Sequence, residues 1–159
     1  MSTLTKELTS NALVAMARNT LVFRDKELEI LKELADECLK NEATTYKLIC
    51  ENDGDKLAGF AIFGKTPLTD FGWDIYWLVV DKDQHGKGIG KKLLSSMETA
   101  MTDLADRAVI RVETSSTDEY LRARLFYRNQ GYREAGVLHD FYAQGNDLVI
   151  YTKSLKSTR

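Results

Sequence analysis

The chain has 159 residues, enough for one domain with a full hydrophobic core, and its formal net charge is −2. Hydrophobic residues make up 43% of it and charged residues 29%, which is ordinary for a globular protein. The slight acidity argues against a nucleic-acid-binding module, since such modules usually carry a basic face. No apolar run approaches the ~18 residues of a membrane span, and the N-terminal segment lacks the pattern of a secretory signal. We therefore expect neither nucleic acid nor membrane as a partner.

The two cysteines, Cys38 and Cys50, lie far apart in the sequence and fit no metal-binding spacing. Both lie in apolar periodic segments. We therefore expect two buried, reduced thiols in a cytoplasmic protein, and no metal site.

Four segments show the apolar spacing of helices. Ser10 and Asp25 are candidate caps for the first two helices, and Ser116 with Glu119 forms a candidate capping box for the fourth. Gly131 is placed to end the fourth helix in a left-handed conformation. The predicted helices are Ser10–Asn19, a segment from Asp25 to about Leu39, a segment from the glycines at 86–90 to about Leu104, and Ser116–Asn129.

Apolar and β-branched runs between turn signals predict the strands. Asn52-Asp53-Gly54-Asp55 is a strong hairpin turn, and Gln144-Gly145-Asn146-Asp147 joins the last two strands. A further strand is an option near Thr3–Leu8. The six predicted strands are Thr45–Glu51, Lys56–Gly64, Trp73–Val80, Ala108–Thr114, Arg133–His139 and Leu148–Lys153. Helices between strands imply a mixed α/β (α+β) sheet with helices on both faces, in a single domain over residues 1–159.

The stretch His85-Gly86-Lys87-Gly88-Ile89-Gly90, between a strand and a helix, is the most informative in the chain. Glycines let the backbone turn sharply and bring N–H groups against a ligand, and the helix start adds unpaired N–H groups and positive potential. Lys87 and Lys91 add full charges. This combination suits a diphosphate.

Two other phosphate-binding motifs fail here. A Walker A loop requires Ser or Thr after its Gly-Lys pair, but Lys92 follows Gly90-Lys91. A dinucleotide-binding fingerprint requires a different glycine spacing, and no strand with an acidic end follows at the right interval.

The glycine stretch resembles the acyl-CoA loop of the GNAT N-acetyltransferase superfamily, whose pattern is Gln or Arg, two residues, Gly, one residue, and Gly or Ala. His85 stands where Gln or Arg is usual. In the family's second hallmark, a tyrosine follows an alanine by four residues, and a glycine next to an aromatic residue follows the tyrosine by four more. Ala123, Tyr127 and Gly131-Tyr132 match this pattern. The resemblance covers about residues 20–155 and implies the GNAT acyl-CoA N-acyltransferase fold.

The resemblance implies acetyl-CoA as co-substrate and an amine as acceptor. In the family, the pantetheine arm pairs with the backbone of the strand before the loop. The resemblance implies that Leu78, Val79 and Val80 supply these main-chain contacts here. The diphosphate would lie on the main-chain N–H groups of the loop, with Tyr120 bordering the cofactor. The implied cofactor contacts in and after the loop are His85, Gly86, Lys87, Gly88, Ile89, Gly90 and Lys91.

Two acids are candidates for a general base that removes the proton of the attacking amine. Glu113 matches the base position of the branch that acetylates ribosomal-protein N-termini, and Asp74 lies where the histone acetyltransferase branch places its glutamate. Tyr127 fits the family's general-acid tyrosine, which protonates the leaving thiolate. Each acid could instead be a solvated residue at a strand end with no role in catalysis, and Tyr127 could instead serve only to pack on the sheet.

The acceptor remains open among small amines, amino acids, aminoglycosides, polyamines and peptide N-termini. Phe141 and Tyr142 lie where relatives that acetylate peptide N-termini carry paired tyrosines, although such a pair also packs well on a sheet edge. His139 is expected to be a solvated polar residue. The resemblance is compatible with a homodimer, with a longer acyl-CoA donor, and with a CoA-binding regulatory module that has lost transfer activity.

Overall fold

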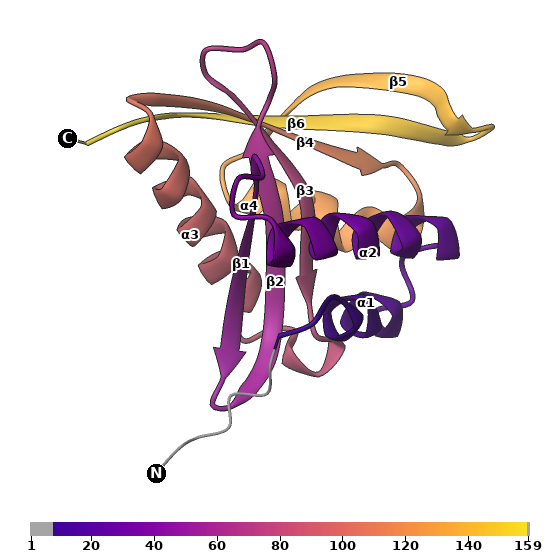
Figure 1. Cartoon of the computed structure of the whole chain (residues 1–159). Helices are drawn as coiled ribbons and strands as arrows, with labels where there is room; N and C mark the ends of the chain where they lie inside the picture. The colour runs from indigo at the N-terminus through magenta and orange to yellow at the C-terminus, as the bar shows by residue number, and fades with distance from the viewer. Residues whose placement is uncertain (1–7, 159) are drawn as a thin grey trace. The chain divides into compact units, whose positions relative to one another are not determined.

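The computed structural model describes residues 8–158, so the strand expected near Thr3–Leu8 lies outside the described residues apart from Leu8. None of the described helices has the length and apolar character needed to cross a bilayer. The elements follow the predicted order, with two short 3₁₀ helices added (Figure 1). They are α1 (Ser10–Asn19), α2 (Asp25–Lys40), β1 (Tyr46–Asp53), β2 (Lys56–Lys65), β3 (Gly72–Val80), η1 (Lys82–Gln84), α3 (Ile89–Leu104), β4 (Arg107–Ser115), η2 (Asp118–Tyr120), α4 (Leu121–Asn129), β5 (Arg133–Ala143) and β6 (Asn146–Lys156).

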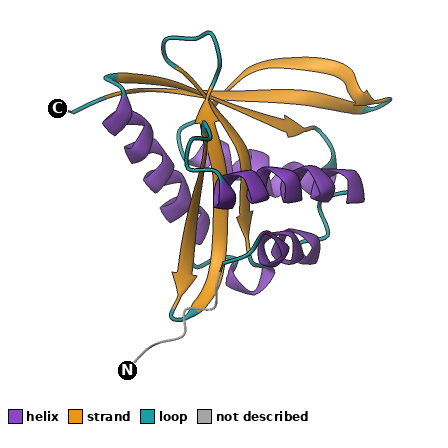
Figure 2. Ribbon diagram, viewed as in Figure 1, coloured by secondary structure: helices purple, strands orange, loops and turns teal. Residues whose placement is uncertain are grey.

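The six strands hydrogen-bond in the order β1-β2-β3-β4-β6-β5, which confirms the predicted mixed sheet (Figure 2). β3 pairs with β4 in parallel, whereas β6 pairs with both β4 and β5 antiparallel. The chain divides into two compact units. The first contains the described residues up to Phe63 and Trp77–Ser96, and the second contains Gly64–Tyr76 and the described residues from Met97 onward. The expectation of one domain remains a prediction.

Helices flank both faces of the strands in the first unit. Phe60 and Ile62 of β2 are fully buried in one cluster with apolar residues of α1 and α2. Gly59 belongs to the opposite face, because successive residues of a strand alternate. A Cβ atom at Gly59 would lie 3.0 Å from side-chain atoms of both Ile89 and Leu93 in α3. The face opposite α1 and α2 is therefore packed against the start of α3.

Two predicted helix caps in the first unit are wrong by one residue. Thr9 caps α1, since its hydroxyl accepts the Ala12 N–H at 3.2 Å. Ser10 instead donates its hydroxyl to Asp36 of α2 at 2.6 Å, which ties the two helices together. α2 begins after Arg24, whose N–H donates to the Glu27 carboxylate at 2.7 Å, as in a capping box.

We predict that Gly59→Ala destabilises the protein by about 1–3 kcal/mol, the usual cost of forcing an extra carbon into a packed interior. The new Cβ would lie 2.8 Å from the Val79 carbonyl oxygen, and that backbone cannot move without disturbing β3. Chemical denaturation measures the effect. Gly136→Ala is the matched control, because a Cβ at Gly136 would meet nothing within 4 Å. Equal stability of the two variants would contradict the packing described for Gly59.

The second unit has its core on one face of β4 and β6. Val112 pairs with Tyr151 across the two strands, and both side chains are buried. Tyr127 of α4 stacks on Tyr151 with the ring centroids 6.4 Å apart, so α4 covers this face. The residues that alternate with Val112 along β4, Arg111 and Glu113, are exposed on the opposite face.

The second unit corrects two local predictions. The Ser116–Glu119 capping box is wrong, because the Ser116 hydroxyl accepts the Asp147 N–H at 2.8 Å and η2 precedes α4. β5 continues to Ala143 and β6 begins at Asn146, so only Gln144 and Gly145 connect them, whereas the predicted strand ends left residues 140–147 between the strands. Gly131 has a φ of 85° and follows α4 in the left-handed conformation expected there.

Candidate active site

The glycine loop of the first unit is shaped by two left-handed residues. β3 ends at Val80, η1 follows, and α3 begins at Ile89. Gly86 and Gly88 both have a φ of 79°, a conformation that residues with a side chain rarely adopt. A Cβ at either glycine would meet nothing within 4 Å. The outer side of the turn is therefore open to a ligand at both positions.

The loop continues directly into a helix, as a diphosphate cradle requires. Gly88 precedes α3, and its carbonyl accepts the Lys92 N–H at 3.0 Å. The N–H groups that follow Gly88 belong to the first helical turn, where no intrahelical carbonyl is in reach. Gly90 lies inside that turn rather than in the loop. These donors, with the positive end of the helix dipole, fit the diphosphate of coenzyme A.

Charged side chains flank the loop in the first unit. Lys87 and Lys91 are exposed, and Lys87 Nζ lies 4.0 Å from the Asp53 carboxylate. Such an exposed pair contributes little, so Lys87 can exchange Asp53 for a phosphate at small cost. The His85 ring nitrogen Nε2 lies 3.1 Å from the Val80 carbonyl oxygen, which connects the loop to the end of β3.

The end of β3 is where the sequence predicts contacts with the pantetheine arm. Val79 is 2% exposed, and its carbonyl faces Gly59 of β2. Leu78 and Val80 are half-buried. Main-chain contacts of these three residues with the cofactor remain a prediction.

In the second unit, Asp74 is fully engaged by neighbouring side chains. Arg111 donates to both its carboxylate oxygens, from Nε at 2.7 Å and from Nη2 at 3.2 Å. Thr66 donates its hydroxyl to Oδ2 at 2.6 Å. The hydrogen bond to Asp74 is the largest reason why the pKa of Arg111 lies above its ordinary value. Both oxygens of Asp74 are therefore committed to holding Arg111 across the β3–β4 pair.

Glu113 is the more available of the two acids. Its side chain is 48% exposed, and Arg111 Nε lies 4.0 Å from Oε1. Asp74 has only 11% of its side chain exposed. Of the two candidates, Glu113 is the carboxylate that can accept a proton without breaking a bidentate ion pair.

Tyr127 belongs to a cluster of aromatic rings in the second unit. It is 5% exposed and makes edge contacts with Phe126 and Tyr132, with ring centroids 5.4 Å apart in each pair. Burial raises the pKa of the Tyr127 phenol, so the hydroxyl is protonated at every pH of an ordinary assay. Tyr120 ends η2 and immediately precedes α4, with its N–H donated to the Thr117 carbonyl at 3.1 Å.

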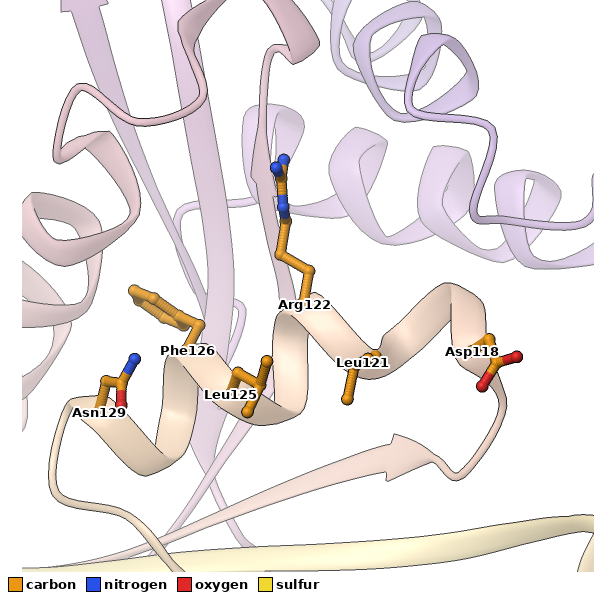
Figure 3. Close-up of a pocket in the computed structure, with 6 residues that line it drawn as sticks. All are labelled: Asp118, Leu121, Arg122, Leu125, Phe126 and Asn129. Atoms are coloured by element: carbon orange, nitrogen blue, oxygen red, sulfur yellow. The ribbon is translucent and has the colours of Figure 1, made fainter.

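An open groove of about 580 Å³ runs along η2 and α4. Figure 3 shows Leu121 and Leu125 on one side of the helix and Arg122 pointing to the other. Tyr127 is not among the lining residues, so this groove contains none of the side chains predicted to do chemistry. The groove is lined by Asp118, Leu121, Arg122, Leu125, Phe126 and Asn129.

Residues 43–134, more than half of the chain, match the acetyltransferase (GNAT) domain model. The chain belongs to the GNAT acetyltransferase family. This match spans both sequence hallmarks, the glycine loop and the Tyr127 segment, and it confirms the resemblance. Membership makes acetyl-CoA the expected co-substrate of this GNAT protein.

Individual relatives agree with the family. An uncharacterised N-acetyltransferase of Methanocaldococcus jannaschii is 28% identical over 144 residues, covering 82% of this chain and 88% of that one. A crystal structure from Desulfovibrio desulfuricans, described as a GNAT-family acetyltransferase, is 30% identical with a TM-score of 0.85, covering 92% and 91%. An aminoglycoside 6'-N-acetyltransferase complexed with coenzyme A has a TM-score of 0.69 at 20% identity, covering 91% and 89%, which shows the shared fold.

The roles of several residues in the second unit were not predicted from the sequence. Thr66 and Arg111, which hold Asp74, carry no local motif. Asp147 was predicted only as part of the last turn, although its carboxylate accepts the Asp140 N–H of β5 at 2.9 Å. Two aspartates flanking the Gln144-Gly145 turn, at Asp140 and Asp147, are a signal that could have pointed to a structured hairpin end.

Proposed function

We propose that this GNAT protein transfers the acetyl group of acetyl-CoA to a primary amine by direct attack in a ternary complex. The amine nitrogen forms a bond to the thioester carbon, and the carbon–sulfur bond breaks. Glu113 accepts the proton that the amine loses, and the Tyr127 hydroxyl protonates the departing thiolate. The glycine loop, Gly86–Gly90, holds the diphosphate of the donor.

The contrast between the two acids carries this assignment. A primary amine of pKa ~10 is mostly protonated at neutral pH, a handicap of about 4 kcal/mol, so a carboxylate able to accept a proton is useful. Glu113 is half-exposed and weakly paired, whereas Asp74 already accepts three hydrogen bonds. We therefore propose Glu113 as the base and Asp74 as the residue that fixes Arg111 beside it.

A thiol-release assay tests the proposal. Acetyl-CoA is mixed with the protein and, in turn, with a peptide bearing a free N-terminal alanine, kanamycin, spermidine and lysine. The proposal predicts acceptor-dependent release of coenzyme A with at least one of them. Calorimetric binding of acetyl-CoA without any release would instead identify a non-catalytic CoA-binding module.

Replacing Glu113 gives a pH-dependent prediction. We expect Glu113→Gln to lower kcat/KM about a hundredfold near pH 7, the range typical of losing a general base. The deficit should shrink as the pH approaches the pKa of the acceptor, because the amine then loses its proton to solvent. Glu134→Gln, which changes another exposed glutamate, is the control. A deficit that stays constant from pH 7 to pH 10 would remove Glu113 from proton transfer.

A further inference from the structure

One face of the second unit carries a row of charged side chains on β3 and β4. Asp74 and Arg111 are Cα partners in the parallel register of the two strands, and Glu113 is the next residue of β4 on the same face. On the other side of β4, Thr152 of β6 pairs with Arg111, and Ile150 pairs with Glu113. Arg111 therefore lies next to two carboxylates on this face, the buried one of Asp74 and the exposed one of Glu113.

The guanidinium of Arg111 is held in one orientation by Asp74. Its Nε and Nη2 donate to the two carboxylate oxygens at 2.7 and 3.2 Å. Asp74 is itself held by the Thr66 hydroxyl at 2.6 Å, and the Thr66 N–H donates to the Gly72 carbonyl at 2.8 Å. A side chain that its neighbours already fix loses little freedom when it binds a ligand. The position of this guanidinium is therefore set before any ligand arrives.

The outer edge of the same guanidinium is open. An arginine carries five N–H groups in a rigid plane, and the bonds to Asp74 use one on Nε and one on Nη2. Nη1 has no hydrogen-bond partner among the residues that the structure describes, and 49% of the side chain is exposed. The N–H groups left on Nη1 and Nη2 form a second fork, and such a fork matches the two oxygens of a carboxylate.

The acceptor comes close to Arg111 if Glu113 is the base. To lose its proton to Glu113, the amine nitrogen has to lie within hydrogen-bond distance of that carboxylate. Arg111 Nε lies 4.0 Å from Oε1 of Glu113. In an α-amino acid the amine nitrogen and the carboxylate carbon are about 2.5 Å apart, because only Cα separates them. Such an acceptor can place its amine at Glu113 and its carboxylate at Arg111 together.

We infer that Arg111 binds the carboxylate of the acceptor, and that the acceptors of this protein are free α-amino acids. The inference rests on the proposed acetyl transfer with Glu113 as base, because that role brings the acceptor to Arg111. A peptide N-terminus has a neutral amide in place of the carboxylate. Polyamines and aminoglycosides carry further positive charges, which a guanidinium repels. Arg111 thus separates one class of candidate acceptor from the others.

Two acceptors that differ in one group test the inference. L-Leucine carries a carboxylate, and L-leucinamide has nearly the same shape with a neutral amide in its place. Their apolar side chain suits Ile150, which is half-buried opposite Glu113. Thiol release gives kcat/KM for both, corrected for the neutral fraction of each amine. We expect a preference for leucine of about tenfold or more, because only leucine forms a charge-assisted bidentate pair.

Arg111→Lys is the variant that tests the second fork. A lysine keeps a positive charge beside Asp74, whose side chain is only 11% exposed and would be costly to leave unpaired, but it has no planar fork for the acceptor. We expect this variant to lose most of the preference for leucine, with an unchanged calorimetric affinity for acetyl-CoA. Arg133→Lys is the matched control. Arg133 is an exposed arginine of β5 that pairs with Thr152, and its replacement should retain the preference.

Binding is also measured without turnover. The Nε–H resonance of Arg111, assigned by its loss in Arg111→Lys, is followed by ¹⁵N NMR during titrations. The two ligands are N-acetyl-L-leucine, which is the expected product, and N-acetyl-L-leucinamide. We expect a saturable shift with the first ligand and none with the second, because the second lacks the carboxylate.

Equal kcat/KM values for the two acceptors, a preference for leucinamide, or a preference for leucine that survives in Arg111→Lys would overturn the inference. So would an Arg111 resonance that N-acetyl-L-leucine leaves unmoved. Failure of the proposed function looks different, because the unmodified protein then releases no thiol with leucine, leucinamide or any compound of the earlier panel. A carboxylate-dependent shift of Arg111 would in that case still support the binding site, and an unmoved resonance would reject it.

Discussion

Gly88→Glu is expected to abolish binding of acetyl-CoA. Gly88 has a φ of 79°, so any side chain there strains the turn by about 1–2 kcal/mol. A glutamate also brings negative charge to the diphosphate. Two unit charges 4 Å apart repel by about 4 kcal/mol at an effective dielectric constant near 20, which is about a thousandfold in affinity. Calorimetry with acetyl-CoA measures the loss.

Two further variants separate charge from strain. Gly88→Ala introduces the strain alone and should weaken binding only about tenfold. Gly145→Glu places the same charge at a residue with a φ of 76° in the β5–β6 turn, where a Cβ meets nothing within 4 Å. Its acetyl-CoA affinity should match that of the unmodified protein. An affinity retained in Gly88→Glu would contradict the assignment of the loop.

Tyr127→Phe is expected to lower turnover about a hundredfold while the affinity for acetyl-CoA changes little. The change removes only the hydroxyl, so the ring keeps its contacts with Phe126, Tyr132 and Tyr151. Because burial raises the pKa of Tyr127, its hydroxyl is protonated throughout the assay range. Steady-state kinetics by thiol release measures the change in turnover, and calorimetry measures the change in acetyl-CoA affinity.

Tyr151→Phe is the matched control for this experiment. Tyr151 is fully buried beside Tyr127, and its hydroxyl has no hydrogen-bond partner among the residues that the structure describes. Removing an unpaired buried hydroxyl should leave turnover unchanged, and it should leave stability equal or higher by about 1 kcal/mol. If both phenylalanine variants lose turnover equally, the effect belongs to the packing of the cluster and not to proton donation.

The parts of this protein predictable from sequence are those encoded by neighbouring residues. The glycine loop is one example, since a strand, two left-handed glycines and a helix start follow one another within a short stretch. Gly131 is another example, because a glycine placed just after a helix commonly adopts the left-handed conformation that ends the helix. Element order followed from apolar periodicity for the same reason. Helix starts were less certain because Thr9 and Ser10 are both good capping residues, and only packing decides between them.

The arrangement around the two acids could not be predicted, because the pairs that define it are distant in sequence. Arg111 and Asp74 are 37 residues apart and meet only through the register of β3 with β4. Asp147 and Ser116 are 31 residues apart and meet only when the β5–β6 hairpin folds back on β4. Strand alternation can assign Asp74 to one face of β3, but it cannot show that an arginine occupies both carboxylate oxygens.

The central claim is that the main-chain amides after β3 bind the diphosphate of the donor. Amide chemical shifts recorded by ¹⁵N NMR during a titration with coenzyme A test it most directly. We expect the largest changes in amide chemical shift at Gly86, Gly88, Ile89 and Gly90. The same titration of the Gly88→Ala variant should give smaller changes in this segment. Saturable binding that leaves these four amides unmoved and shifts others would contradict the account.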